Sequence, residues 1–195
     1  MIVVGLTGSI AMGKSETARM FAARGIPVFD SDAAVHELYD AGGAAVEPLR
    51  NLAADAVVDG RVDRRRLAAL VQADSSLLRK IEAVVHPLVK ARQKAFLAEA
   101  ETRSDIAVLD IPLLFETARE SEVDVVVVVS ADAELQRRRA LARPGMTAEK
   151  LDFILSRQVP DAEKRARADY VIDTSVSLAE TEREVERVIA DIRKR

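Results

Sequence analysis

The fold is decided by the stretch Gly8-Ser9-Ile10-Ala11-Met12-Gly13-Lys14-Ser15, which fits the pattern G-x-x-x-x-G-K-[ST] without a gap. An apolar run over residues 2–6 predicts a buried strand before it, and residues 16–23 predict the helix after it. In this order, the N–H groups of the turn and the positive end of the helix dipole point at a phosphate group. The stretch therefore predicts a nucleoside triphosphate site, and the alternative is a glycine-rich connector.

Each part of this loop has a chemical task. Lys14 can reach the outer phosphates of the nucleotide, and the Ser15 hydroxyl is placed to ligate Mg²⁺. The residues expected to line the nucleotide phosphates are Gly8, Ala11, Met12, Gly13, Lys14, Ser15 and Glu16. Ala11 stands where many such loops have glycine, so a positive φ there would cost about 1 kcal/mol or more. Glu16 suits the helix dipole but lies close to bound phosphates, so both residues could weaken nucleotide affinity.

Composition excludes several classes of protein. The 195 residues are 49% hydrophobic and 31% charged, which is typical of a soluble globular chain with one sizeable core. The absence of cysteine excludes disulfides and thiolate chemistry and fits a reducing cytoplasm. No apolar run is long enough to span a bilayer, and the N-terminus lacks a signal-peptide start. A net charge of −3 with few aromatic residues argues against nucleic-acid binding, so we expect neither a nucleic acid nor a membrane as partner.

The remaining pattern predicts an α/β fold. Further strands are expected over residues 26–29, 106–110, 123–129 and 170–173. The run 123–129 is apolar on both faces, which indicates the centre of a parallel sheet covered by helices. Residues 33–101 are expected to be mostly helical with one polar interruption, punctuated by Gly42-Gly43 and Asp59-Gly60, and His86-Pro87 marks a kink or a new helix start inside the pattern 77–98. The stretch Ser177-Leu178-Ala179-Glu180 is a capping box that opens the last helix.

Acidic residues follow two of these strands. Asp30 and Asp32 come at the end of the second strand, where ligands bind in α/β sheets. One carboxylate suffices to cap the helix that begins near Ala33, so we expect the other, Asp32, to face the site. Asp110 ends the third strand, a position from which a carboxylate can hold Mg²⁺ indirectly.

Several basic residues could meet anions. Arg139 and Arg143 are four residues apart, which would put them on one helix face, and the following Pro144-Gly145 suits a lid that closes on phosphates. The alternative is a solvated basic face. The charged run 61–66 is read as solvated or as contacting an anionic substrate, and His86 as a bend residue or a ligand contact.

Taken together, the chain resembles the dephospho-coenzyme A kinases. The resemblance rests on the phosphate loop and on segments spread over nearly the whole chain: Ile26-Pro27-Val28 before Asp30-Ser31-Asp32, His86-Pro87-Leu88, Ile111-Pro112-Leu113-Leu114-Phe115-Glu116, Gln136 with Arg139 and Arg143, and Ala168-Asp169-Tyr170-Val171-Ile172-Asp173. The chain departs from the family at Ser9 and Ala11, where glycine is typical, at Glu16, where Thr or Ser is usual, and at Thr174, where Asn is common. Threonine in place of asparagine at position 174 bears on how the chain would contact the adenine ring of the nucleotide.

The resemblance implies a P-loop fold with a five-stranded parallel sheet, a helical region that binds the acceptor, and a lid. The expected organisation is a single kinase domain over residues 1–195, with a core over about 1–32, 104–135 and 168–195, an acceptor region over about 33–103 and a lid over about 136–160. It implies that ATP phosphorylates the 3′-hydroxyl of dephospho-coenzyme A in the last step of coenzyme A synthesis. A cytoplasmic monomer is expected.

The resemblance also implies roles for single residues. Lys14 would steady the phosphates, Asp32 would orient or deprotonate the acceptor hydroxyl, and Arg139 would stabilise charge on the transferring group. Arg143 would close over the nucleotide. The residues expected on the acceptor side are His86, Pro112, Leu113 and Leu114.

Three other functions remain open from the residues alone. A nucleoside monophosphate kinase would have the same parts and another acceptor. A GTP-dependent switch lacks support, because the chain has no Asn-Lys-x-Asp motif. A nucleotide-binding protein without catalysis is disfavoured by Lys14, Ser15 and Asp32.

Overall fold

The computed structural model describes all 195 residues, and the chain folds into two compact units. Residues 1–29 and 100–195 form the first unit, and residues 30–99 form the second. In chain order the elements are β1 (Ile2–Thr7), α1 (Lys14–Ala23), β2 (Val28–Asp30), α2 (Ser31–Tyr39), α3 (Val46–Leu52), η1 (Ala54–Ala56), β3 (Val57–Val58), β4 (Arg61–Val62), α4 (Arg64–Ala73), α5 (Ser76–Glu101), β5 (Ile106–Asp110), η2 (Glu120–Glu122), β6 (Val125–Ser130), α6 (Ala133–Leu141), α7 (Ala148–Leu155), α8 (Asp161–Ala166), β7 (Tyr170–Asp173) and α9 (Leu178–Ile192).

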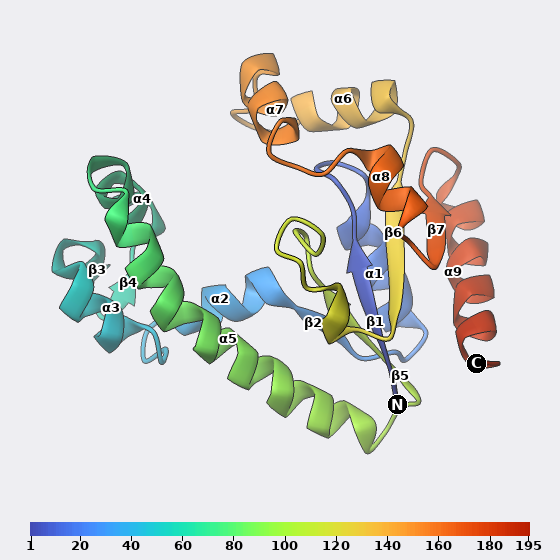
Figure 1. Ribbon diagram of the computed structural model, residues 1–195, viewed down its shortest axis with the longest axis horizontal. Coiled ribbons are helices and arrows are strands. Elements are labelled where there is room, and N and C mark those ends of the chain that lie inside the picture. Colours follow the sequence, from blue (N-terminus) through green and yellow to red (C-terminus); the bar gives the residue numbers. More distant parts are fainter. The chain divides into compact units, whose positions relative to one another are not determined.

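The first unit is built on a five-stranded parallel sheet of order β2-β5-β1-β6-β7, with β1 at its centre (Figure 1). Strand β1 pairs in parallel with β5 on one side, with Ile2 opposite Ile106, and with β6 on the other, with Val4 opposite Val125. The chain adds β2 and β5 to one side of β1 and then crosses to add β6 and β7 on the other. The carboxyl end of β1 is therefore the point where the strand order reverses, which is where ligands bind in open α/β sheets.

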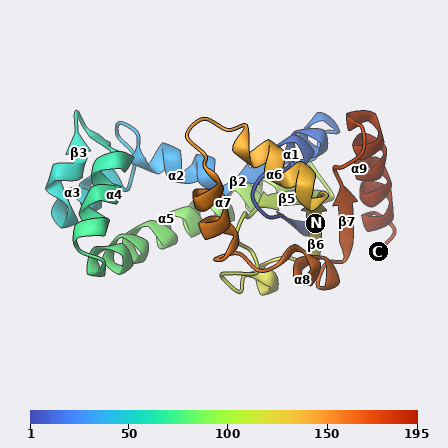
Figure 2. The ribbon, with the colours of Figure 1, turned by 90° about the horizontal axis from the view of Figure 1, so that it is seen from above.

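Both faces of the sheet are buried, as the apolar strands predict. One face packs on α1 and α9 through a cluster that includes Val4, Leu6, Phe21 and Val185. Helix α8 packs against β6, and α9 lies alongside β7 (Figure 2). The Ser177–Glu180 capping box that begins α9 is present, which confirms that part of the prediction.

The second unit has its own apolar core. Helices α2 to α5 bury side chains such as Leu38, Leu49, Leu67 and Ile81 against one another. A short antiparallel hairpin, β3–β4, lies between η1 and α4, where helix was expected with a single polar interruption. Its turn is Asp59-Gly60, both with positive φ, which is the type I′ geometry that Asp-Gly favours in hairpins.

Helix α5 runs unbroken from Ser76 to Glu101 with Pro87 inside it, so no new helix begins at His86-Pro87. Proline removes one hydrogen bond of the helix. Leu77, Ile81 and Val85, four residues apart, are buried in the core of the unit and anchor the part of the helix that precedes the proline. No helix of the chain combines the length and the apolar character needed to cross a lipid bilayer.

Candidate active site

The phosphate loop joins β1 to α1 at the carboxyl end of the central strand. Gly8 must be glycine, because a Cβ there would come within 2.6 Å of the carbonyl oxygen of Val129. Gly13 has a φ of 93° and is the N-cap of α1. The first N–H groups of α1 have no acceptor within their own helix, and they point out of its positive end. This is the anion-binding geometry that the sequence predicts.

Ala11 adopts the positive φ that is costly for a residue with a Cβ. Its φ is 63°, in the left-handed region that costs a residue with a Cβ roughly 1–2 kcal/mol. The side chain is 7% exposed and packs with Ala140 and Leu151 in a small apolar cluster that also includes Ile10. The packing of its methyl group offsets part of the strain.

Lys14 forms an ion pair with Asp110. The carboxylate of Asp110 is only 5% exposed and comes from the last residue of β5, the strand beside β1. The sequence places an acid at that strand end, and the structure brings it into contact with the lysine of the loop. Lys14 is thus partly buried, with 16% of its side chain exposed.

The two residues that follow Lys14 keep solvent-exposed surface. Ser15 is exposed in the first turn of α1, and Glu16 pairs with Arg19 at 2.7 Å. That pairing directs the Glu16 carboxylate along the outside of the helix. The structure contains no group of three or more His, Cys, Asp or Glu side chains that could hold a metal ion.

The two acids at the junction of β2 and α2 differ in their contacts. Asp30 is the N-cap of α2 and accepts a hydrogen bond from the Ala33 N–H at 2.9 Å. Asp32 lies in the first turn of α2 and is exposed, and capping does not need its carboxylate. His86 is also exposed, on α5 of the same unit.

The arginine run 61–66 contacts groups of its own unit. Arg61 pairs with Asp40 at 3.2 Å, and Arg64 lies 5.7 Å from the ring centroid of Tyr39. Burial raises the pKa of the Tyr39 hydroxyl, and the nearby Arg64 charge acts in the opposite direction. These contacts account for the two arginines as part of the unit's own structure.

The prediction that Arg139 and Arg143 share a helix face is wrong. Helix α6 ends at Leu141, and Arg143 lies beyond it in a turn, where its N–H donates to the Ala140 carbonyl oxygen. The cause is Pro144, since a residue before proline is pushed out of the helical region.

Arg139 is held by Thr174 at the end of β7. The guanidinium donates to the Thr174 hydroxyl at 3.0 Å and to its carbonyl oxygen at 2.8 Å. The same hydroxyl donates to the carbonyl oxygen of Met12 at 2.7 Å. Arg139 is therefore tied to the phosphate loop through the position at which asparagine is common.

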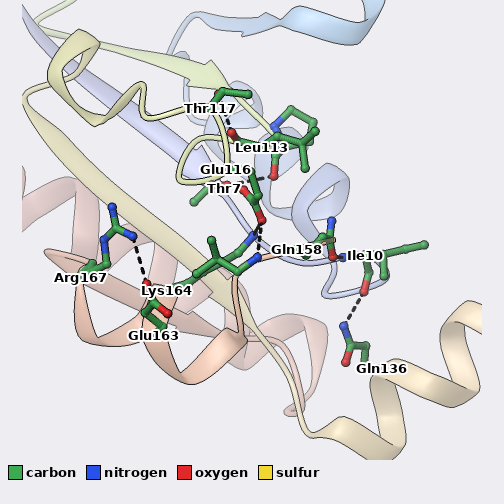
Figure 3. Close-up of polar contacts among 12 residues, drawn as sticks. Thr7, Ile10, Leu113, Glu116, Thr117, Gln136, Gln158, Glu163, Lys164 and Arg167 are labelled. Atoms are coloured by element: carbon green, nitrogen blue, oxygen red, sulfur yellow. Dashed lines mark hydrogen bonds and ion pairs between the residues drawn. The ribbon is translucent and has the colours of Figure 1, made fainter. Parts of the chain in front are cut away.

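The segment after β5 is partly exposed and partly core. Leu113 is 44% exposed, whereas Leu114 is fully buried and has no side-chain surface left for a ligand. Thr7 donates to the Pro112 carbonyl oxygen at 3.3 Å, which ties this segment to the end of β1 (Figure 3). Of the three residues of this segment that were expected on the acceptor side, Pro112 and Leu113 keep exposed surface and Leu114 does not.

Comparison with known proteins agrees with this geometry. The model of a protein family described as dephospho-CoA kinase matches residues 2–180. A dephospho-CoA kinase of Mesorhizobium japonicum is 55% identical over 99% of this chain and 98% of its own length. The chain belongs to the dephospho-CoA kinase family. It is therefore a kinase of the final step of coenzyme A biosynthesis.

Solved structures support the fold of this family for the chain. TT1252 from Thermus thermophilus is 38% identical, with a TM-score of 0.84 over 98% of this chain and 97% of that one. A dephospho-CoA kinase from Campylobacter jejuni, at 23% identity, has a TM-score of 0.74 over the same shares of the two chains and shows the likeness of the folds.

Sequence reasoning missed two polar residues that contact the kinase's phosphate loop, Gln136 and Gln158, and an ion pair that contacts the neighbour of Gln158 in the chain. Gln158 and Lys164 were not singled out, and Glu116 and Gln136 entered only as parts of motifs. Lys164 is fully buried and lies 2.7 Å from the Glu116 carboxylate (Figure 3). An isolated lysine in a charged helix such as 161–166 carries no signal of burial, so only the fold reveals it.

Proposed function

We propose that this chain transfers the γ-phosphoryl group of ATP to the 3′-hydroxyl of dephospho-coenzyme A, and that residues 8–16 hold the triphosphate. The observation that carries the proposal is the complete phosphate loop at the strand-order reversal of a chain whose family phosphorylates dephospho-coenzyme A. Phosphoryl transfer asks mainly for positioning and electrostatic stabilisation. The backbone N–H groups of the loop and the Lys14 ammonium supply both at the phosphates.

Mg²⁺ fits the groups present. Ser15 offers a hydroxyl beside the loop, and Asp110 offers a carboxylate at the neighbouring strand end. Mg²⁺ takes oxygen ligands and keeps several waters and phosphate oxygens, so a site with few protein ligands suits it. Ser15 would ligate the ion directly and Asp110 would hold it indirectly. When bound, the ion neutralises charge on the β- and γ-phosphates.

The acceptor hydroxyl is assigned to Asp32, which would orient it or accept its proton. Two features of the chain support this assignment. Asp32 follows a sheet strand by two residues, and the cap of α2 is supplied by Asp30 instead. The helical unit 30–99 would bind the acceptor, with His86 contributing from α5, and Pro112 and Leu113 would contact it from the segment after β5.

Residues 136–160 would act as a lid, with Arg139 stabilising charge on the transferring group and Arg143 contacting the nucleotide. The contact of Arg139 with Thr174, one hydrogen bond away from Met12, supports a position beside the loop. Arg143 lies beyond the end of α6, next to the Pro144-Gly145 turn. We further propose that the enzyme is a cytoplasmic monomer acting on small molecules.

The experiment that tests Asp32 compares Asp32→Asn with Asp30→Asn. Asparagine caps a helix about as well as aspartate, so Asp30→Asn should keep both stability and activity. Asp32→Asn keeps the size of the side chain but removes its proton-accepting capacity, so kcat should fall by about a hundredfold or more. Steady-state kinetics with ATP and dephospho-coenzyme A, beside a melting curve of each variant, measure both effects.

A variant Asp32→Asn that keeps most of its kcat would remove the acid from the mechanism. A loss of activity in Asp30→Asn with unchanged stability would move the role to Asp30 instead.

A further inference from the structure

The backbone of Ile10, in the middle of the phosphate loop, forms hydrogen bonds with two glutamine side chains. The side-chain amide of Gln136 donates to the Ile10 carbonyl oxygen at 2.9 Å. The Ile10 N–H donates to the Gln158 side-chain oxygen at 3.1 Å. Figure 3 shows the two glutamines approaching this residue from different segments. We call Gln136 and Gln158 the glutamine clamp.

The clamp acts next to the strained residue of the loop. The Ile10 carbonyl belongs to the peptide bond that precedes Ala11, and the orientation of that peptide sets the φ of Ala11. That φ is 63°, which an alanine outside such constraints rarely adopts. Strained backbone persists only where surrounding contacts over-determine it. The Gln136 hydrogen bond restrains the peptide before Ala11 directly, and the Gln158 hydrogen bond restrains the peptide between Ser9 and Ile10.

The clamp glutamines stand near the two ends of the segment 136–160. Gln136 is 7% exposed within α6, and Gln158 follows α7. The next residue, Val159, donates its N–H to Glu116 at 2.9 Å, and Glu116 also pairs with the buried Lys164. The hydrogen bond of Val159 therefore fixes the backbone next to Gln158 and helps to position its side chain.

From these contacts we infer that Gln136 and Gln158 are positioning residues that hold the phosphate loop in its binding conformation. Gln136 fixes the peptide bond between Ile10 and Ala11, and Gln158 fixes the preceding one, between Ser9 and Ile10. The clamp takes the place of the glycine that many such loops have at this position, since glycine adopts a positive φ without strain. Because both glutamines belong to the segment 136–160, the clamp also couples the conformation of that segment to the conformation of the phosphate loop. The inference rests on the proposed binding of the ATP phosphates by residues 8–16.

The test measures initial rates with ATP, Mg²⁺ and dephospho-coenzyme A for Gln136→Leu and Gln158→Leu. The loop contacts the phosphates in both the ground state and the transition state, so loss of the clamp should act mainly on KM. We expect the KM for ATP to rise about tenfold, with the KM for dephospho-coenzyme A and the melting temperature nearly unchanged. Asp152→Ala is the matched control, because it removes the 2.9 Å Arg137–Asp152 contact between α6 and α7 and leaves the loop untouched.

The decisive measurement is whether the substitution Ala11→Gly restores the KM for ATP in the glutamine variants. Adding Ala11→Gly to either glutamine variant should restore the KM for ATP by about threefold or more, because glycine needs no clamp to hold a positive φ. A merely structural role of the glutamines in the segment 136–160 predicts no rescue. Should Gln136→Leu fail to fold because its site is buried, the half-buried Gln158 carries the test alone.

Two results would overturn the inference: an unchanged KM for ATP in a folded Gln158→Leu variant, or a double variant with Ala11→Gly that stays as impaired as the single one. Failure of the proposed function is distinguishable, since the unaltered chain would then not phosphorylate dephospho-coenzyme A at all.

Discussion

The buried ion pair between Lys164 and Glu116 makes a prediction whose size follows from its surroundings. Lys164 is fully buried on α8, and the Glu116 side chain is only 10% exposed. The Glu116 oxygen nearest the ammonium, at 2.7 Å, also accepts the Val159 N–H at 2.9 Å. Lys164→Met removes the cation and leaves the carboxylate in a site that water scarcely reaches.

Breaking a buried pair in this way costs about 3–5 kcal/mol in the free energy of unfolding. In a chain of this size each kcal/mol lowers the melting temperature by about 2–4 °C, so the expected loss is about 6–20 °C. The double variant Lys164→Met with Glu116→Leu should recover most of that loss, because two apolar side chains carry no desolvation penalty. Thermal and urea unfolding of the two single variants, the double variant and the unaltered chain give the coupling free energy.

Lys194→Met is the matched control. Lys194 pairs with Asp191 at 3.0 Å, but 74% of its side chain is exposed, so its loss should leave the melting temperature unchanged. The reasoning is refuted if Lys164→Met loses less than about 1 kcal/mol, or if the double variant is as unstable as the sum of the two single ones.

Three further predictions follow from the site and its supporting elements. Lys14→Ala should lower kcat by about a hundredfold or more, measured by steady-state kinetics, and its melting temperature should also fall because Lys14 pairs with buried Asp110; unchanged kcat/KM would remove the lysine from the mechanism. Arg139→Ala should lower kcat more than it weakens ATP binding, and Arg143→Ala should act mainly on the affinity for ATP; normal kinetics and normal ATP affinity in both would make them solvated residues. Ser177→Ala should lower the melting temperature by about 2–4 °C near neutral pH. Hydrogen bonds from Ser177 hold the pKa of Glu180 below its usual range, so the part of the stabilisation that comes from the Glu180 carboxylate is present above the unfolded pKa and should be lost as the pH drops below about 4. The cap bond from the Glu180 N–H to the Ser177 hydroxyl does not titrate and remains; a deficit as large at pH 3 as at pH 7 would contradict this account.

The parts of the fold that a local pattern determines were predictable from the sequence. The phosphate loop, the apolar strands and the Ser177–Glu180 cap each need only neighbouring residues, and the structure confirms all three. The positive φ of Ala11 was foreseen as a cost because the loop pattern demands that conformation whatever residue stands there.

Features that depend on contacts across the chain were not predictable. The Asp59-Gly60 hairpin was taken for an interruption between helices, because two-residue strands give no periodic signal. The spacing of Arg139 and Arg143 was read without the effect of Pro144 on its predecessor. Gln158 reaches Ile10 over 148 positions of sequence, and a lone glutamine carries no mark of such a contact.

The most direct test of the central claim is a comparison of acceptors. The chain is incubated with ATP and Mg²⁺ in the presence of dephospho-coenzyme A, AMP, CMP or no acceptor, and kcat/KM is measured from ADP release and from the phosphorylated product. Dephospho-coenzyme A should be phosphorylated far better than either nucleotide, with the new phosphate on its 3′-hydroxyl. A higher kcat/KM for AMP or CMP would contradict the account, even though the fold and the phosphate loop would stand.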